Sequence, residues 1–365
     1  MKIAIIGGGI VGSVAAFYLS QTEHEITLFD EGTGQATKAA AGIICPWFSK
    51  RRNQAWYQLA NKGAHFFPTF LHDLAEQGIH SNAYQQRETW LVKKRPDQIA
   101  SLYAFVKQRQ QEAPLIQEVV ILTPKEQRER LPEFHYDHEV LSVKGGAVID
   151  GALLCSDLLT AAQANGLQVQ ATHATLSPQA APFLINGTAF ERVIVAAGAW
   201  LPHVLSEFPC EVDIVPQKGQ LAVYHNRTET KDWPLIMPES AADIIPHPAG
   251  TLYLGATHEK NVGYDLTVDE AVLHPLLESV QDFLPDLATM AYDAIKVGTR
   301  AYTSDFSPFY GEVAHYPHLY VASGLGASGL TTGPLIGHEL AKLALDEIPT
   351  LPTEPYRPDP YITFN

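Results

Sequence analysis

The chain has 365 residues, which is enough for two lobes that each bury a hydrophobic core. Its 40 acidic residues against 25 basic ones give a formal net charge of −15, and this argues against nucleic acid as a main partner, because phosphate binding needs basic patches. No stretch beyond residue 20 reaches the roughly eighteen apolar residues of a membrane span, and the three cysteines are far apart, so we expect a cytoplasmic protein with free thiols, no metal site and no membrane span.

The first thirty residues predict a strand, a tight turn, a helix and a second strand. Residues 2–6 (KIAII) are a short apolar run typical of a buried strand, and residues 13–20 (SVAAFYLS) predict a helix. Residues 26–29 (ITLF) predict the second strand, which ends on Asp30. The turn carries the spacing G-x-G-x-x-G at Gly7, Gly9 and Gly12. This order is that of a dinucleotide-binding unit.

Each glycine of this turn has a physical reason to be there. Gly7 lets the chain turn sharply, Gly9 lets the backbone approach a pyrophosphate, and Gly12 lets the helix pack closely on the sheet. The helix N-terminus offers free N–H groups to the phosphates, and Asp30 stands where a carboxylate can accept hydrogen bonds from two ribose hydroxyls. The apolar start also resembles a signal peptide, but the three glycines would break its helix and a second strand follows at once.

The next hundred residues mix helix and strand patterns. Residues 37–46 (TKAAAGIICP) are small, and they either pack helices tightly or let backbone approach a large planar ligand. Residues 54–77 predict a long amphipathic helix, broken or kinked at Pro68. A strand at 88–94, a helix at 96–111 and a short helix to residue 131, opened by a capping box at Thr123 and Glu126, follow.

The remaining chain returns to a buried parallel pattern and then changes to an antiparallel one. A helix over 151–165 capped by Asp150 precedes a wholly apolar strand at 193–197 (VIVAA). A second capping box, at Thr267 and Glu270, predicts a helix to about residue 283. Further strands are expected at 167–170, 183–185, 211–224, 235–236, 242–246, 251–256, 297–302 and 319–322. A glycine-rich loop at 323–329, a helix over 330–345 and a proline-rich tail of extended surface coil complete the chain.

These patterns predict a two-lobed α/β fold. A Rossmann-type lobe is built from discontinuous segments, and a second lobe carries an antiparallel sheet. The expected boundaries give residues 1–80, 145–208 and 296–365 to the nucleotide lobe and residues 81–144 and 209–295 to the substrate lobe.

Seven stretches together resemble one known family, the D-amino-acid oxidase-like FAD-dependent amine oxidoreductases, with glycine oxidase and the bacterial D-amino-acid dehydrogenases as its nearest branches. In chain order they are GGGIVG, FDEG, ATKAAAGII, VIVAAGAW, GTLYLGATHE, GTRAYTSDFSPFYG and VASGLGASGLTTGP. Each one alone is degenerate, whereas their order and spacing over nearly the whole chain are specific.

The resemblance implies FAD, held without a covalent bond. It assigns Thr175 to a main-chain contact with adenine, and residues near 326–331 to the pyrimidine side of the flavin, where backbone N–H groups can stabilise negative charge. The residues that it assigns to FAD are Gly7, Gly9, Ile10, Val11, Gly12, Asp30, Glu31, Thr37, Ala41, Gly42, Ile43, Thr175, Ala197, Gly198, Trp200, Gly326, Ser328, Gly329, Leu330 and Thr331.

Arg300 stands where the family places the arginine that binds substrate, five residues before Asp305. A guanidinium offers a fork of donors that matches a carboxylate in two parallel bonds. The alternatives are a surface arginine or a structural pair with Asp305. The cysteine that binds flavin covalently in sarcosine oxidase would fall at Arg300, which excludes that link.

Other positions depart from the family pattern. Tyr253 stands where sarcosine oxidase has a lysine that aids the reaction with oxygen; it either faces the flavin and contacts substrate or is a core aromatic residue. Leu235 and Ala327 stand where glycine oxidase places a tyrosine and a second arginine near its substrate. These departures leave substrate size and electron acceptor open, and we expect the reduced flavin to react slowly with oxygen.

The resemblance implies an enzyme that oxidises the C–N bond of a small amino acid, such as glycine, a D-amino acid or an N-alkyl amino acid. Hydride transfer to flavin N5 would give an imine that hydrolyses, with oxygen or another compound as electron acceptor. One alternative is an oxidoreductase of a non-amino-acid amine or a modified nucleotide, and another is a non-catalytic FAD-binding scaffold. The sequence leaves a homo-oligomer open.

Overall fold

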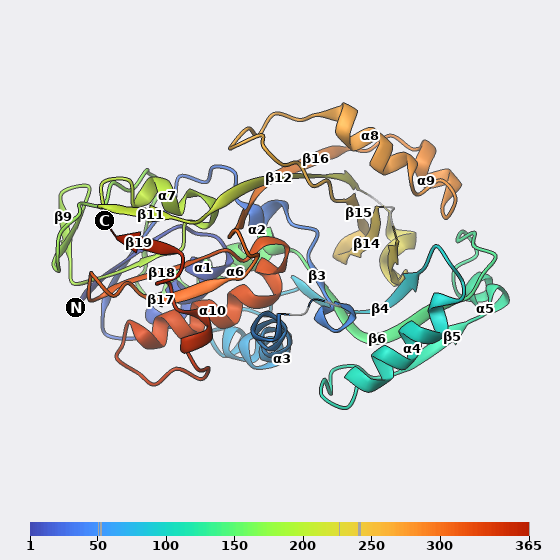
Figure 1. Ribbon diagram of the computed structural model, residues 1–365, viewed down its shortest axis with the longest axis horizontal. Coiled ribbons are helices and arrows are strands. Elements are labelled where there is room, and N and C mark those ends of the chain that lie inside the picture. Colours follow the sequence, from blue (N-terminus) through green and yellow to red (C-terminus); the bar gives the residue numbers. More distant parts are fainter. Residues whose placement is uncertain (50, 52, 226, 240–241, 365) are drawn as a thin grey trace.

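Two β-sheets lie side by side along the long axis of the molecule in the computed structural model (Figure 1). The structure describes residues 1–365 except 50, 52, 226, 240, 241 and 365. Both chain termini lie at one end, beside the first sheet (Figure 1). The fold is the α/β arrangement that the sequence predicts, with a parallel sheet and a largely antiparallel one.

The first sheet has the strand order β17-β18-β10-β1-β2-β7, and only β17 runs antiparallel to its neighbour. Its central strands are apolar because both of their faces are covered. The strands are β1 (Lys2–Ile6), β2 (Glu25–Phe29), β7 (Gln168–Gln170), β10 (Arg192–Val195), β17 (Phe309–Glu312) and β18 (Leu319–Ser323).

Helices cover one face of this sheet and smaller elements cover the other. The first face packs against α1 (Ile10–Leu19), α3 (Gln54–Glu76), α6 (Gly151–Ala164) and α10 (Gly329–Leu343). The second packs against the hairpin of β8 (Phe183–Ile185) and β9 (Thr188–Phe190) and against α7 (Leu201–Val204). The predicted cap of α6 is confirmed, since the Asp150 carboxylate accepts hydrogen bonds from two backbone N–H groups at 2.9 and 3.1 Å.

The second sheet has the order β16-β12-β15-β14-β13-β4-β6-β3, and β5 adds to β6. Only the pairing of β13 with β4 is parallel. Its strands are β3 (Ile43–Ile44), β4 (Tyr84–Val92), β5 (Val119–Leu122), β6 (Val140–Ile149), β12 (Val215–Tyr224), β13 (Leu235–Pro238), β14 (Asp243–His247), β15 (Thr251–Gly255) and β16 (Ala294–Tyr302). Two expected boundaries, at residues 145 and 296, fall inside β6 and β16.

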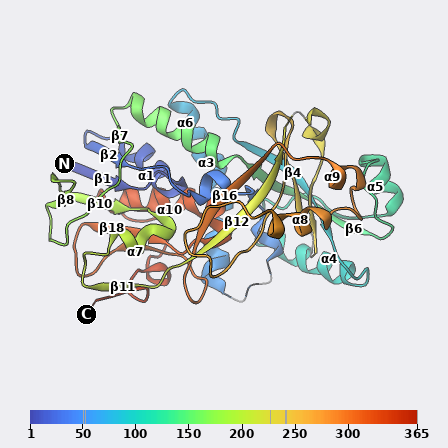
Figure 2. The ribbon, with the colours of Figure 1, turned by 90° about the horizontal axis from the view of Figure 1, so that it is seen from above.

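The two faces of the β12–β16 region of this sheet pack against different parts of the molecule. One face packs against α8 (Glu270–Glu278) and α9 (Pro285–Thr289), which lie along the upper edge of the molecule in Figure 1 and, for α8, over the second sheet in Figure 2. The opposite face carries a smaller apolar cluster that packs against Ala41 and Ile43. The helices α4 (Gln98–Arg109) and α5 (Pro124–Arg130) lie at the far end of the molecule, beside β5 (Figure 1). The capping box of α5 at Thr123 is confirmed.

The second predicted capping box is wrong. The carboxylate of Asp269 caps α8, accepting a hydrogen bond from the backbone N–H of Ala271 at 3.0 Å. Thr267 lies outside the helix, and its carbonyl accepts a hydrogen bond from the Lys218 ammonium. The helix also ends at Glu278, earlier than expected. The local sequence allows either Thr267 or Asp269 to cap the helix. The contact between Lys218 and the Thr267 carbonyl holds Thr267 outside the helix, and Asp269 is the cap.

The expected coil at the C-terminus is also wrong in part. The strand β19 (Ile362–Phe364) pairs with β11 (Cys210–Val212), and the Tyr356 ring is buried with its hydroxyl donating to the carbonyl of Ala55 at 2.9 Å. Helix α3 runs as one element through Pro68. Across the described part of the chain, no helix combines the length and the apolar character needed to cross a membrane.

Candidate active site

A single long cavity runs from the parallel sheet to the antiparallel one. It starts beside Asp30 and Glu31, passes the glycine turn and ends under the second sheet at Arg300. The predicted residues that line it are Gly7, Gly9, Ile10, Val11, Asp30, Glu31, Thr37, Ala41, Gly42, Ile43, Ala197, Gly198, Trp200, Arg300, Gly326, Gly329 and Leu330.

The glycine turn has no room for side chains. Gly7 has a φ of +104°, and a Cβ there would lie 2.5 Å from the carbonyl oxygen of Ala196. A Cβ at Gly12 would lie 1.8 Å from the Gly7 carbonyl oxygen, so Gly12 packs the helix onto the turn and does not line the cavity. The backbone of the turn and the start of α1 thus form an open cradle for an anionic group.

The Asp30 carboxylate braces the same turn. It accepts hydrogen bonds from the backbone N–H of Gly8 at 2.5 Å and of Gly32 at 2.6 Å, and from the side-chain amide of Gln35. A carboxylate has about four acceptor sites, so one remains for a ribose hydroxyl. Asp30 therefore has a structural role, and its contact with a ribose hydroxyl stays a prediction.

A strip of small residues forms the middle of the cavity wall. It follows the short helix α2 (Ala36–Ala39), and Gly42 has a φ of +81° with its Cβ position 2.0 Å from the carbonyl oxygen of Ile149. A Cβ at Gly298 of β16 would lie 2.8 Å from that of Ala39. Between the two readings of this strip, backbone exposed to a flat ligand fits the lining of the cavity.

Several predicted site residues do not line the cavity. Thr175 pairs its backbone N–H and C=O with Asn186, whereas the preceding residue, Ala174, lines the wall. Ser328 donates to the Leu325 carbonyl at 2.8 Å. Thr331, like Gly12, is a buried helix residue. In this stretch, Thr172, His173 and Ala174 form the cavity wall.

Arg300 lies on the face of β16 that is directed at the cavity. Its guanidinium lies flat over Gly219 of β12, where a Cβ would be 2.6 Å from the guanidinium carbon. Nη1 donates to the Thr257 carbonyl at 3.0 Å and, more weakly, to the Gln217 side chain at 3.4 Å. Nε and Nη2 donate to no residue in the described part of the chain. Burial lowers the pKa of Arg300.

The alternative pairing of Arg300 with Asp305 is not what the structure shows. The Asp305 carboxylate accepts hydrogen bonds from Thr303, Ser307 and the Tyr361 hydroxyl. Two donors of the guanidinium fork are thus left for a ligand in the cavity.

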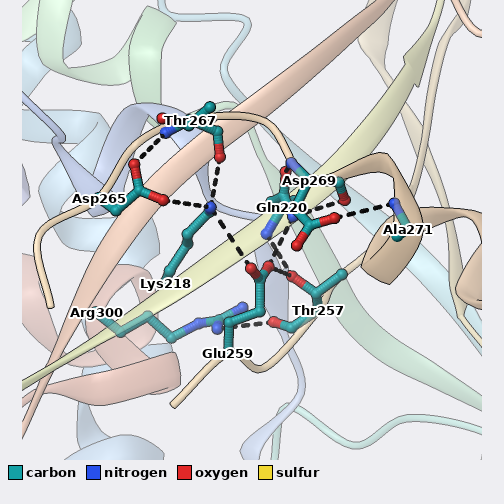
Figure 3. Close-up of polar contacts among 9 residues, drawn as sticks. All are labelled: Lys218, Gln220, Thr257, Glu259, Asp265, Thr267, Asp269, Ala271 and Arg300. Carbon is teal, nitrogen blue, oxygen red and sulfur yellow. Dashed lines mark hydrogen bonds and ion pairs between the residues drawn. The ribbon is translucent and has the colours of Figure 1, made fainter. Parts of the chain in front are cut away.

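A buried polar network supports Arg300 from the far side of β12 (Figure 3). The Glu259 carboxylate accepts from the Thr257 hydroxyl at 2.6 Å and from the Gln220 amide at 2.8 Å, and it lies 3.6 Å from the Lys218 ammonium. Lys218 also pairs with Asp265 at 3.3 Å. Because this network holds the segment whose carbonyl binds Arg300, it fixes the position of the guanidinium.

Tyr253 lies in the packed cluster beneath the sheet and does not line the cavity. Its hydroxyl accepts a hydrogen bond from the Lys296 ammonium at 2.6 Å, and its ring contacts that of His247 in a tilted arrangement with 3.9 Å between centroids. Burial raises the pKa of Tyr253 and lowers that of Lys296. Of the two readings, the structure favours the core aromatic one.

Some cavity residues are not recognisable from the sequence alone. His258 lines the wall near Arg300, Asp243 lines it from β14, and Gly219 and Gly298 line it from β12 and β16. A glycine inside a strand pattern often marks a place where a ligand or another backbone approaches closely. Gly219 and Gly298 were therefore the only signal in the sequence that could have indicated these parts of the cavity wall. Nothing local distinguishes Asp243 from an ordinary surface carboxylate.

The cavity fits FAD on its own geometry. The parallel sheet supplies a glycine cradle and a helix N-terminus for a pyrophosphate, and the strip of small residues exposes backbone to a flat ring system. The second sheet closes the other end with a buried cation. A dinucleotide lobe whose cavity continues under an antiparallel sheet defines a two-lobed, dinucleotide-dependent oxidoreductase.

The comparisons with known proteins name the family. The family model described as DAO, FAD dependent oxidoreductase, matches residues 2–343, and the chain belongs to this family, whose cofactor is FAD. The chain is 35% identical to an uncharacterized oxidoreductase, YurR, of Bacillus subtilis (strain 168), over 97% of each chain. It is 25% identical to a glycine oxidase of Pseudomonas aeruginosa over 98% of each.

A solved structure agrees in both sequence and shape. The crystal structure of iminodiacetate oxidase (IdaA) from Chelativorans sp. BNC1 superposes with a TM-score of 0.92 at 29% identity, over 98% of each chain. The predicted family, fold class and cofactor are thereby confirmed.

We expect the FAD to be bound without a covalent link. Purified protein should be yellow, and acid or heat precipitation should release FAD into the supernatant, because Arg300 replaces the cysteine that would hold the ring. Absorbance spectra of the supernatant and pellet check this. Flavin that stays with the precipitate would contradict it.

We expect Asp30→Ala to weaken FAD binding by about ten- to a hundredfold, which corresponds to losing charged hydrogen bonds of roughly 1.5–3 kcal/mol. The turn at Gly8 loses its brace at the same time. Titration of apoprotein with FAD measures the dissociation constant. Glu31→Ala is the matched control, since Glu31 is the neighbouring acid at the cavity wall. If only Glu31→Ala weakened FAD binding, Glu31 and not Asp30 would bind the ribose.

We expect Glu259→Gln to destabilise the fold by about 2–4 kcal/mol, because the buried Lys218 ammonium keeps only one carboxylate partner. Asp265→Asn is the control: Asp265 is half-exposed, so its loss should destabilise the fold much less than the loss of Glu259. Urea denaturation of both variants measures the difference. Equal effects would show that the network does not depend on Glu259.

Proposed function

We propose that this enzyme oxidises the C–N bond of a small amino acid whose carboxylate binds Arg300. The observation that carries the proposal is a buried guanidinium at the cavity wall with Nε and Nη2 unused by the described residues. A buried cation without an acid partner is costly. A carboxylate entering the cavity would supply that partner in two parallel bonds.

The names of the relatives support a small substrate with a carboxylate. Iminodiacetate and glycine each carry at least one carboxylate and an amine on the adjacent carbon, and proteins named for their oxidation are similar to this chain over nearly its whole length. The relative at 35% identity has no named substrate. The choice among glycine, D-amino acids and N-alkyl amino acids therefore depends on experiment.

The roles of the protein's own residues follow from their positions. FAD, when bound, supplies the electron-accepting centre for a hydride from the substrate. Arg300 fixes the position and angle of the substrate through its carboxylate, and Gly219 provides the space in which the guanidinium lies. The second sheet covers this end of the cavity and limits the access of water.

The two alternatives, a non-catalytic FAD-binding scaffold and an oxidoreductase of an amine without a carboxylate, give Arg300 no partner. A scaffold protein that only binds FAD has no use for an unpaired guanidinium in its cavity. An oxidoreductase of an amine without a carboxylate would leave Arg300 unpaired in the complex. The electron acceptor stays open between oxygen and another compound.

Anaerobic bleaching of the flavin absorbance tests the proposal. Glycine, sarcosine, iminodiacetate and D-alanine form the substrate panel, and each is matched to the corresponding amine without its carboxylate. We expect bleaching with at least one acid and little with its amine. No bleaching by any member of the panel would remove the amino-acid proposal.

We expect Arg300→Ala to lower kcat/KM by about thirty- to several-thousandfold, or roughly 2–5 kcal/mol, because the carboxylate loses its charged partner. Arg300→Lys should recover only part of this, since an ammonium keeps the charge without the fork. Steady-state kinetics on the best acid of the panel measure both.

The matched comparison is the preference for the acid over its decarboxylated amine. The wild type should prefer the acid strongly, and Arg300→Ala should lose most of that preference while its FAD content stays near normal. A preference that survives the substitution would show that the carboxylate binds elsewhere.

A further inference from the structure

Asp243 is a carboxylate at the cavity wall for which the described residues offer no partner. It opens β14 and lines the same cavity as Arg300. Its carboxylate makes no hydrogen bond or ion pair with any of the described residues. Buried carboxylates in proteins are ordinarily paired or hydrogen-bonded. Asp243 is half-buried, and its carboxylate is therefore available to accept a hydrogen bond from a ligand in the cavity.

The strand register places Asp243 on the same face of the sheet as the Arg300 guanidinium. Directly paired residues of an antiparallel sheet share a face, and Asp243 pairs with Gly255, which pairs with Leu221. Leu221 shares its face with Gly219, on which the guanidinium lies, since alternate residues of a strand point the same way.

The same register gives the separation. Gly219 and Asp243 are two strands and two residues apart, which is about 12 Å between Cα atoms at ordinary sheet spacing. The guanidinium lies over Gly219, and the Asp243 side chain stands on the same face. A small amino acid with one hydrogen bond of about 3 Å at each end spans most of this separation, and a lean of the side chains along the strand direction reduces the rest.

We propose that Asp243 binds the amino group of the substrate and takes a proton from it, while Arg300 holds the carboxylate. This rests on the proposed function. In the step, an N–H bond of the substrate ammonium breaks, its electron pair stays on nitrogen, and an O–H bond forms on the Asp243 carboxylate. The neutral amine that results is the form whose Cα–H electrons can leave to FAD, the acceptor of this family.

The surroundings of Asp243 suit this task. Burial raises the pKa of its carboxyl to about 7, so it is a stronger base than an ordinary aspartate and is ionised above that pH. Burial also lowers the pKa of the two nearby histidines, that of His247 to about 4. The titratable and charged groups on this side of the sheet are Cys45, Arg87, Asp150, His247, Tyr253, His258, Lys296 and Arg300.

The first test follows activity against pH with the fastest acid of the panel. Wild-type kcat/KM should fall below about pH 7 as Asp243 takes up a proton. Asp243→Asn should lower kcat/KM by about a hundred- to ten-thousandfold and abolish the fall of kcat/KM below pH 7. His258→Gln, a change of another titratable residue at the cavity wall, should keep this fall. A wild-type rate and an unchanged fall in Asp243→Asn would overturn the proposal.

The second test uses acetate, which has the carboxylate without the amine, and reads binding from the flavin absorbance of holoenzyme. Below pH 7, acetate should bind the wild type and Asp243→Asn equally. Above pH 7, wild-type affinity should fall about three- to tenfold, because the ionised Asp243 repels the anion, and the variant should show no such fall. If the acetate affinities of wild type and Asp243→Asn depended on pH in the same way, the proposal would be overturned. Acetate that never binds wild type would instead refute the carboxylate site at Arg300.

The third test separates an unpaired site residue from a structural one. The raised pKa means that wild-type stability is progressively lost as pH rises from the ordinary carboxyl range to about 7. Asp243→Asn, and Asp243→Ser as a second variant, should therefore raise Tm relative to wild type more at pH 8 than at pH 5. A variant that melts below wild type at pH 8 would show a structural partner and overturn the proposal.

Discussion

The constraint on which this end of the cavity depends is a largely enclosed cation, Arg300, that forms no ion pair with any acid among the described residues. The Arg300 guanidinium makes its hydrogen bonds to a carbonyl and an amide, neither of which neutralises its charge. Burial lowers the pKa of Arg300, which shows that the folded protein disfavours the charge it carries. Such an arrangement persists only where a ligand completes it or where neighbouring structure holds it in place.

The neighbouring structure is divided between the two faces of β12. Gly219 on one face leaves the space that the guanidinium occupies. Lys218 and Gln220 on the other face belong to the network that holds Thr257 (Figure 3). Because side chains alternate along a strand, one short stretch of sequence both makes room for Arg300 and fixes the segment that it binds. A shift of one residue in register would exchange these tasks and destroy both.

The parts of the fold that the sequence predicts are those encoded locally. The first strand, turn and helix follow from glycine chemistry within thirty residues, and the cap at Asp150 follows from one side chain. The parts that it does not predict depend on pairings between distant segments. Lys218 moves the cap of α8 from Thr267 to Asp269, and β11 gives the C-terminal tail a strand partner. No local pattern contains those contacts.

The same limit explains which site residues were found. Arg300 stands in a recognisable stretch, whereas Asp243 becomes a site residue only when β14, β15 and β12 are brought into register. Each of the two charges is unfavourable alone: burial lowers the pKa of the arginine and raises that of the acid. They are too far apart for direct contact, so neither relieves the other. If the proposed roles of Arg300 and Asp243 hold, a zwitterion of the right length relieves both at once, and a ligand with only one charge leaves the other without a partner. On that proposal, selectivity for amino acids over simple acids and simple amines follows from the distance between the two charges, with no need for a closely fitting apolar pocket.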